Sequence, residues 1–125
     1  MKKLLSLVLL ILIGCSKPEP EPINIEWLVE REEGIYYTMD TNKPYSGPVF
    51  YLDPIENKKQ QILTLKNGKK EGPYKSFYLN NGNLMLEGTY KNGVKDGIER
   101  WYDNDGELEE EKTYINGELI ERKEY

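Results

Sequence analysis

The sequence has no histidine and only one cysteine, Cys15, among its 125 residues. An intramolecular disulfide is therefore impossible, and zinc or haem sites built from histidine and cysteine are excluded. Ser46 and Ser76 are isolated, and neither lies in a Gly-x-Ser-x-Gly turn of the kind that presents a nucleophile. We therefore expect no cofactor, no metal site and no enzymatic activity, although the sequence does not exclude a pair of carboxylates of the glycosidase type.

Long apolar runs are also scarce, and the one that exists stands at the N-terminus. Met1-Lys2-Lys3 precedes an apolar stretch over residues 4–13 that only Ser6 interrupts. A transmembrane helix needs about 20 apolar residues, so this run is too short to span a bilayer. It has the length and flanks of a secretory signal. A buried helix is the alternative, but the run has no polar face, and we expect residues 1–14 to be a signal peptide.

The cysteine follows that run directly. Leu12-Ile13-Gly14-Cys15 resembles the lipobox of bacterial lipoproteins. The resemblance implies cleavage before Cys15, a diacylglyceryl group on its thiol, and acylation, typically by palmitate, of the new N-terminus. Two or more acyl chains anchor a protein stably where one does not. A free thiol and an intermolecular disulfide are the alternatives. Because Ser16 rather than aspartate comes next, the lipoprotein interpretation favours the outer membrane if the source is a diderm bacterium.

Residues 16–22 read Ser-Lys-Pro-Glu-Pro-Glu-Pro, and we expect residues 15–22 to be a lipidated cysteine with a tether. Alternating prolines block helix and strand pairing and favour an extended chain of about 3.1 Å per residue, or roughly 20 Å in all. After residue 14, 15 basic and 22 acidic residues leave a net charge of −7. That charge argues against nucleic acid as a partner and against docking on anionic headgroups.

A repeat of about 25 residues fills most of the remaining chain. Leu65-Lys-Asn-Gly-Lys-Lys-Glu-Gly72 recurs as Tyr90-Lys-Asn-Gly-Val-Lys-Asp-Gly97, and a degenerate copy starts at Tyr114. Gly47, Gly72 and Gly97 are spaced by 25 residues. The copy that begins at Tyr114 is truncated, so the sequence leaves the number of repeats open between three and four.

Asn-Gly and Asp-Gly dipeptides separate segments of strand composition. They readily adopt a positive φ at both central positions, as a type I′ hairpin turn requires. Between them, Leu84, Leu86 and Tyr90 fall on one face of a strand, and Glu87 falls on the other. We therefore expect each repeat to be one β-hairpin that extends a common antiparallel sheet. The five dipeptides are Asn67-Gly68, Asn81-Gly82, Asn92-Gly93, Asp105-Gly106 and Asn116-Gly117.

This pattern resembles the MORN-repeat variant family of bacteria over about residues 28–125. The resemblance implies an all-β fold, an open single-layer antiparallel meander of stacked hairpins, with residues 23–45 as an N-terminal lead-in and 46–125 as repeats. It implies no catalytic residues. Some members carry an antitoxin label. The first repeat departs from the pattern, because Asp53-Pro54-Ile-Glu-Asn57 replaces the Asn-Gly dipeptide, and we expect a longer, less regular loop there.

Aromatic pairs follow each repeat glycine and form the candidate binding surface. We expect the second members to align across the repeats, and likewise the first members. One series would pack the sheet, and the other would be exposed to a peptide or glycan. Asp103-Asn-Asp105-Gly106 starts like a calcium loop, but Tyr114 stands where the bidentate glutamate belongs, so a turn is favoured. The two series are Tyr51, Tyr78 and Tyr102, and Phe50, Phe77 and Trp101.

The sequence thus predicts a lipid-anchored, non-catalytic β-repeat domain of the bacterial cell envelope. The membrane is its partner through Cys15, and another protein is the expected partner of the repeats. The alternative is an antitoxin or immunity-type protein that neutralises a toxin by direct binding. The oligomeric state is not predicted.

Overall fold

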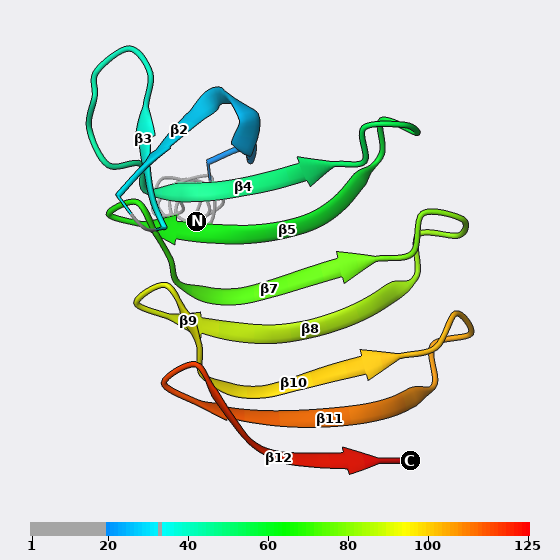
Figure 1. The fold of residues 1–125 in the computed structure, drawn as a ribbon. Helices are drawn as coiled ribbons and strands as arrows, with labels where there is room; N and C mark the ends of the chain where they lie inside the picture. Colours follow the sequence, from blue (N-terminus) through cyan, green and yellow to red (C-terminus); the bar gives the residue numbers. More distant parts are fainter. Residues whose placement is uncertain (1–19, 33) are drawn as a thin grey trace, which may run out of the picture.

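A computed structural model describes residues 20–32 and 34–125 of the chain. The expected signal peptide, Cys15 and the first part of the tether lie outside the described residues. Figure 1 shows a meander in which successive hairpins are stacked down the molecule. Within the part that is described, no helix has the length and hydrophobicity needed to cross a membrane.

The main sheet is an open antiparallel meander, as the sequence predicts. Its strand order is β1-β4-β5-β7-β8-β10-β11-β12. Three complete hairpins and a further strand, β12, make up the repeat region. The hairpin strands are β4 (Gly47–Leu52), β5 (Lys59–Lys66), β7 (Gly72–Phe77), β8 (Leu84–Lys91), β10 (Gly97–Tyr102), β11 (Leu108–Ile115) and β12 (Glu118–Glu124); the two-residue strands β6 (Lys69–Lys70) and β9 (Val94–Lys95) pair with β5 and β8.

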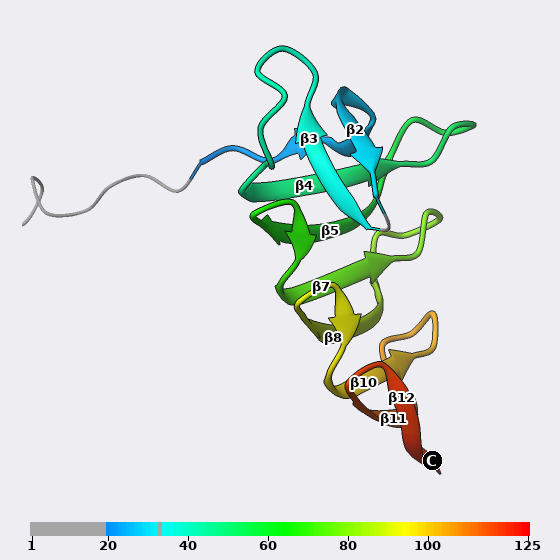
Figure 2. The same ribbon diagram turned by 60° about the vertical axis from the view of Figure 1, so that its left-hand side comes forward.

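The residues before β4 form a separate cover. β1 (Ile23–Asn24) pairs in parallel with β4, and η1 (Ile25–Trp27) follows it as one turn of 3₁₀ helix. β2 (Leu28–Arg31) and β3 (Ile35–Thr38) then form their own two-stranded sheet, which crosses in front of β4 and β5 in Figure 2. Ile25 and Leu28 are buried in the hydrophobic core with Val49 and Leu63. This lead-in covers one face of the first hairpin.

We call the face under this lead-in the inner face and the opposite one the outer face. Because strand residues alternate in direction, the pairing register assigns every side chain to one of them. Val49 pairs with Leu63, Tyr74 with Gly88, and Glu99 with Lys112, so these residues share the inner face. Leu84 and Leu86 were predicted to share a face, but a β-bulge makes Met85 the extra residue between them.

The Asn-Gly turns confirm the turn prediction at three of five places. Both central residues have positive φ at 67–68, 92–93 and 116–117, with values from 49° to 88°. Their glycine N–H groups also join the repeats: Gly93 donates to the Lys70 carbonyl at 2.9 Å, and Gly117 to the Lys95 carbonyl at 2.8 Å. At Asn81-Gly82 and Asp105-Gly106 the prediction of a type I′ turn is wrong, because only the glycine has a positive φ there.

The first repeat's loop also differs from expectation, because it is as regular as the second. In both loops the first residue's N–H bonds the carbonyl five residues on, as in Asp53 to Lys58 and Tyr78 to Asn83. Asn57 adopts φ +55° where Gly82 has +74°. Asparagine tolerates this left-handed conformation, so it replaces the glycine without lengthening the loop. The third loop is the shorter one, closed by Asp103 N–H on the Glu107 carbonyl.

Tyrosine rings laid over glycines cover the middle of the inner face. A Cβ added to Gly88 would lie 2.6 Å from the hydroxyl oxygen of Tyr74 and 2.8 Å from its ring carbon Cζ. Tyr74 is only 2% exposed, and its ring centre lies 4.5 Å from that of Tyr90. The missing side chain at Gly88 is therefore what lets the tyrosine lie flat on the sheet.

Replacing Gly88 with alanine should lift this ring. We expect Gly88→Ala to lower the free energy of unfolding by about 1–3 kcal/mol, the usual cost of overpacking a core. Denaturant unfolding followed by tyrosine fluorescence measures the difference. Thr64→Ala, at an exposed position of β5, is the control and should change stability by less than about 0.5 kcal/mol. Equal effects of the two variants would contradict the ring-on-glycine packing.

Candidate functional site

The inner face changes in character along the sheet. The central residues of the first two hairpins are apolar or aromatic, namely Val49, Leu63 and Tyr74. In the third hairpin the equivalent positions are Glu99 and Lys112. Val49, Tyr74 and Glu99 follow one another at intervals of 25 residues, so the same place in the sheet is filled first by hydrophobic side chains and then by a charged one. The lead-in does not reach this end of the sheet in either view (Figures 1 and 2).

Glu99 is the centre of the charged part. Its side chain is 2% exposed and accepts three bonds. Lys95 Nζ lies 2.7 Å from Oε2, Trp101 Nε1 donates to Oε1 at 2.7 Å, and the Tyr74 hydroxyl donates to Oε2. A buried carboxylate is tolerable only when its lone pairs are used in this way. Glu99 thus accepts bonds from one cation on β9 and from two neutral donors, one on β7 and one on β10 itself.

The pKa values of this cluster follow from the same contacts. Burial by itself would raise the pKa of Glu99, but the hydrogen bonds from Lys95, Tyr74 and Trp101 and the charge of Lys95 outweigh it and lower the pKa below 4.5. Burial would lower the pKa of Lys95, whereas its bond to Glu99 raises it. Burial and the bond to Glu99 raise the pKa of Tyr74. The cluster therefore stays as an ion pair with a neutral tyrosine near neutral pH, which leaves no base with a pKa suited to proton transfer.

Lysines cover the next two tyrosines of the inner face. Lys70 Nζ lies 5.2 Å from the ring centre of Tyr90, and Lys95 Nζ lies 5.1 Å from that of Tyr114. Both lysines come from β6 and β9, the short strands that follow the Asn-Gly turns. The repeat thus places a cation over a tyrosine twice. Tyr90 and Tyr114 are half-buried, and so is Trp101, over which Lys112 Nζ lies at 4.7 Å.

The structure corrects the predicted aromatic series. When strand positions are counted from the repeat glycines, Tyr51 is equivalent to Ser76 and Trp101. All three lie on the inner face. Phe50 lies on the outer face, under Lys59 Nζ at 4.8 Å. Neither predicted series lines up. The other members are Phe77 and Tyr102, at the ends of β7 and β10, and Tyr78, in the loop after β7, whose hydroxyl donates to the Tyr102 carbonyl at 2.7 Å.

Ser76 interrupts an aromatic position and leaves a pocket on the inner face. Tyr51 occupies this position one repeat earlier and Trp101 one repeat later. Ser76 is 8% exposed, and its hydroxyl oxygen accepts a bond from Gln61 Nε2 at 3.0 Å. The pocket has a volume of about 260 Å³. It is lined by Tyr51, Gln60, Gln61, Ser76, Met85 and Leu86.

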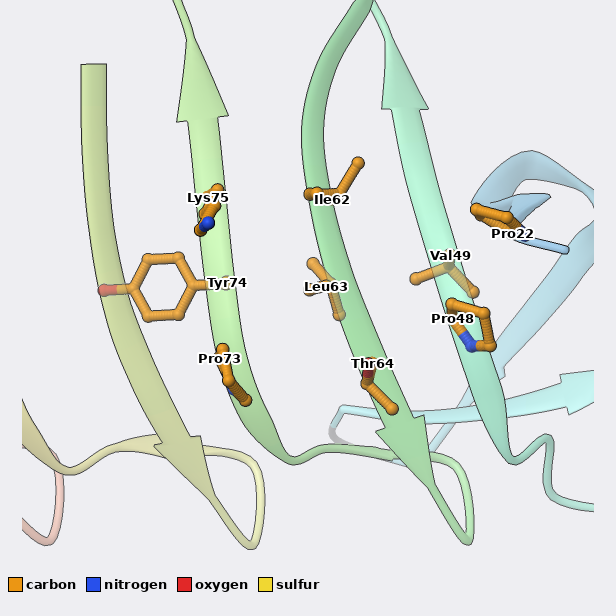
Figure 3. Close-up of a pocket in the computed structure, with 9 residues that line it drawn as sticks. All are labelled: Pro22, Pro48, Val49, Ile62, Leu63, Thr64, Pro73, Tyr74 and Lys75. Atoms are coloured by element: carbon orange, nitrogen blue, oxygen red, sulfur yellow. The ribbon is translucent and has the colours of Figure 1, made fainter. Parts of the chain in front are cut away.

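A second pocket, shown in Figure 3, lies over β4, β5 and β7 and includes Pro22, the last residue of the tether. Its volume is about 200 Å³. Thr64 and Lys75 carry the polar side chains of its lining, and the other residues are apolar or Tyr74. This pocket lies where the predicted tether meets the folded part. It offers fewer hydrogen-bonding groups than the pocket at Ser76, which is the better candidate for a site that recognises a ligand.

The acidic turn after β10 is a turn, as the sequence favoured. The Asp103 Oδ1 atom accepts bonds from the N–H groups of Asp105 and Glu107, both at 2.9 Å. The carboxylate therefore organises its own loop. Among residues 20–32 and 34–125, no three acidic, histidine or cysteine side chains are grouped closely enough to hold a metal ion.

Neutralising Glu99 should weaken the fold and remove part of its acid sensitivity. We expect Glu99→Gln to lower the free energy of unfolding by about 2 kcal/mol at neutral pH, because bonds to a charged group are lost. The lowered pKa means that this stabilisation is complete above pH 4.5 and disappears as the pH falls through the folded-state pKa.

Unfolding titrations at several pH values test this prediction. The gap between wild type and Glu99→Gln should close in acid. Glu111→Gln, which removes an ion pair with Arg100 on the outer face, is the control and should cost less than about 1 kcal/mol. A gap that stays constant from neutral pH to below the folded-state pKa would show that the Glu99 charge is not what stabilises this end.

Two crystal structures of TarM share 16% identity with this chain. The TM-score is 0.42 for a Staphylococcus aureus TarM mutant in complex with fondaparinux, α-GlcNAc-glycerol and UDP, and 0.43 for the other TarM structure. In each case the overlap covers 77% of this chain and only 21% of the other. TM-scores this low carry no information on function. No curated protein matches the sequence significantly.

A family model does match the repeats found in the structure. The model of the MORN repeat variant matches residues 70–92, from the end of β6 through β8, and residues 95–116, from β9 through β11. The two matches are adjacent and correspond to the second and third hairpins. Residues 70–92 and 95–116 are thus similar to two adjacent MORN variant repeats, and a repeat of this kind suggests a module for protein or membrane interaction.

Proposed function

We propose that the chain is a lipid-anchored, non-catalytic repeat domain that binds another protein of the cell envelope through the uncovered part of its inner face. The observation that carries the proposal is the half-buried aromatic surface of the second and third hairpins, formed by Tyr90, Trp101 and Tyr114, which the lead-in leaves uncovered. Aromatic side chains of this kind are enriched where proteins meet. They stand on paired strands, so little ordering is needed when a partner binds.

The anchor would keep this face close to a membrane. The lipid would be attached to Cys15, and the tether would separate it from β1 by roughly 20 Å when extended. Pro22 joins the first hairpin, so the third hairpin is the part farthest from the tether along the sheet. A partner in the same compartment would meet the open inner face there first.

Neutralisation of a toxin is the second candidate function. The net charge of −7 after residue 14 favours a basic partner. Exposed carboxylates of the loop after β10, Asp105 and Glu107, and Glu109 at the start of β11 would contribute to such an interface. The two functions differ in the partner: a toxin encoded beside this chain supports neutralisation, and a resident envelope protein supports a scaffold.

Replacing Cys15 should prevent anchoring. We expect Cys15→Ala to accumulate as a precursor that retains residues 1–14, because the acylated thiol is what signal peptidase II recognises in lipoproteins. Metabolic labelling with a fatty-acid probe should then fall to background, and Ser16→Ala should label like wild type. Unchanged labelling of Cys15→Ala would rule out lipid on this residue.

Photo-crosslinking tests the inner face directly in native envelopes. A benzoylphenylalanine in place of Tyr114 should give a discrete crosslinked product with one protein. The same residue in place of Ile98, which is 42% exposed on the outer face of the adjoining strand, is the matched control. Equal crosslinking from both faces, or none from Tyr114, would contradict an inner-face interface. Mass spectrometry of the product distinguishes a toxin from a resident protein.

A further inference from the structure

The pocket at Ser76 exists because the second hairpin lacks the aromatic residue that the other two hairpins carry at this position. Tyr51 and Trp101 hold the equivalent positions of the first and third hairpins, and both are half-buried aromatics. Ser76 is small, so the space that a ring would fill is empty. Leu86 pairs with Ser76 on one side and with Trp101 on the other, which places the pocket in the same row as both rings.

The polar groups of this pocket are neutral and form a compact set. Gln61 Nε2 donates to the Ser76 hydroxyl oxygen, which leaves the hydroxyl proton free to be donated and the Gln61 carbonyl oxygen free to accept. Gln60 adds a second side-chain amide to the lining. No residue of the lining carries a charge. The pocket therefore offers hydrogen bonds in both directions without selecting for a charged ligand.

The rest of the lining is apolar. The Tyr51 ring and the Met85 thioether face the same space as the amides, and Leu86, 9% exposed, completes it. Tyr51 is packed against the hydrophobic core, and so is Tyr36 of the lead-in. Such a ring is a fixed, flat surface that needs no further ordering when a ligand stacks on it.

These features select a class of ligand by elimination. A charged group would find no counter-charge in the lining, and its desolvation would be uncompensated. A purely apolar side chain would bury the Ser76 hydroxyl and the glutamine amides without partners, which costs binding energy. A neutral ring with hydroxyls on its edge and C–H groups on its face satisfies both kinds of surface.

We propose that the pocket at Ser76 binds a neutral sugar ring of a glycan, with the ring stacked on Tyr51 and its hydroxyls bonded to Gln61 and Ser76. The volume of about 260 Å³ suits a single ring, because it lies just below the roughly 300 Å³ at which pockets for larger ligands begin. The site is separate from the protein interface proposed at Tyr114, so the domain would hold a glycan and a protein at two places on one face.

Methionine-methyl NMR of the full chain in a sugar-free zwitterionic detergent tests this site. Met85 lines the pocket, and Met39, 60% exposed in the loop between β3 and β4, is the internal control. Titration with methyl glucoside or N-acetylglucosamine should shift the Met85 methyl signal with a Kd in the millimolar range and leave Met39 unchanged. Indole and phenol, as models of aromatic side chains, should shift it less.

Two variants locate the effect. Ser76→Tyr restores the ring that the other repeats carry and should abolish the Met85 shift. Gln61→Leu keeps the size of the side chain and should weaken sugar binding about tenfold, the effect of one lost hydrogen bond. Retained Met39 shifts and unfolding midpoints in both variants show that the fold is intact.

The opposite outcomes overturn the proposal. A Met85 shift that is larger with indole or phenol than with sugars would assign the pocket to a peptide side chain. If the Met85 signal does not shift with either sugar at a concentration about ten times the expected millimolar Kd, the pocket is not a sugar site. Crosslinking from Tyr114 should persist in Ser76→Tyr, so failure of the sugar site is distinguishable from failure of the protein interface.

Discussion

A single layer of strands must keep one of its faces from water with very little chain to cover it, and this constraint governs the whole molecule. The lead-in protects only the first hairpin, where Val49 and Leu63 are buried beneath Ile25 and Leu28. Each such side chain contributes about 1.5–3 kcal/mol when fully buried. Beyond the lead-in, the sheet covers itself: Tyr74 lies flat over Gly88 and packs against Tyr90, with the two rings tilted by 46°. At the far end the face is polar, and both carboxylate oxygens of Glu99 have donors.

The sequence predicts the architecture well because the features that set it are local. Asn-Gly dipeptides dictate backbone conformation at three turns, and glycines at 25-residue intervals mark where each repeat begins. The prediction at Asn81-Gly82 failed because a dipeptide does not fix the length of its loop. The second loop spans six residues, from Tyr78 to Asn83, and only its αL position requires glycine or asparagine. Asn57 fills that position in the first loop, which is why an apparently irregular sequence gives a regular turn.

The aromatic surface was harder to predict. The prediction aligned aromatic residues of the same kind, and Phe50, Phe77 and Trp101 are 27 and 24 residues apart. Strand position instead repeats with the constant 25-residue spacing of the glycines. In a strand, a shift by one residue moves a side chain to the other face. Counting from Gly47, Gly72 and Gly97 would have placed Tyr51, Ser76 and Trp101 together, and would have set Glu99 at the buried position of Val49 and Tyr74. Without that count, nothing in the sequence distinguishes Glu99, which is buried, from the exposed acidic residues.

Because the inner face changes from apolar to ion-paired, the two ends of the sheet are stabilised by different interactions. Solenoid-like repeats contact mainly their neighbours, so each hairpin depends on the one beside it. The first hairpin is held by hydrophobic burial under the lead-in, which salt leaves intact or strengthens. The far end is held by pairs such as Lys95 with Glu99 and Arg122 with Glu110, which salt weakens where they are exposed. Local opening should therefore start at β12 and proceed toward β4. A force applied by a partner bound at β12 would peel the strands off one after another, while the first hairpin, under the lead-in, opens last.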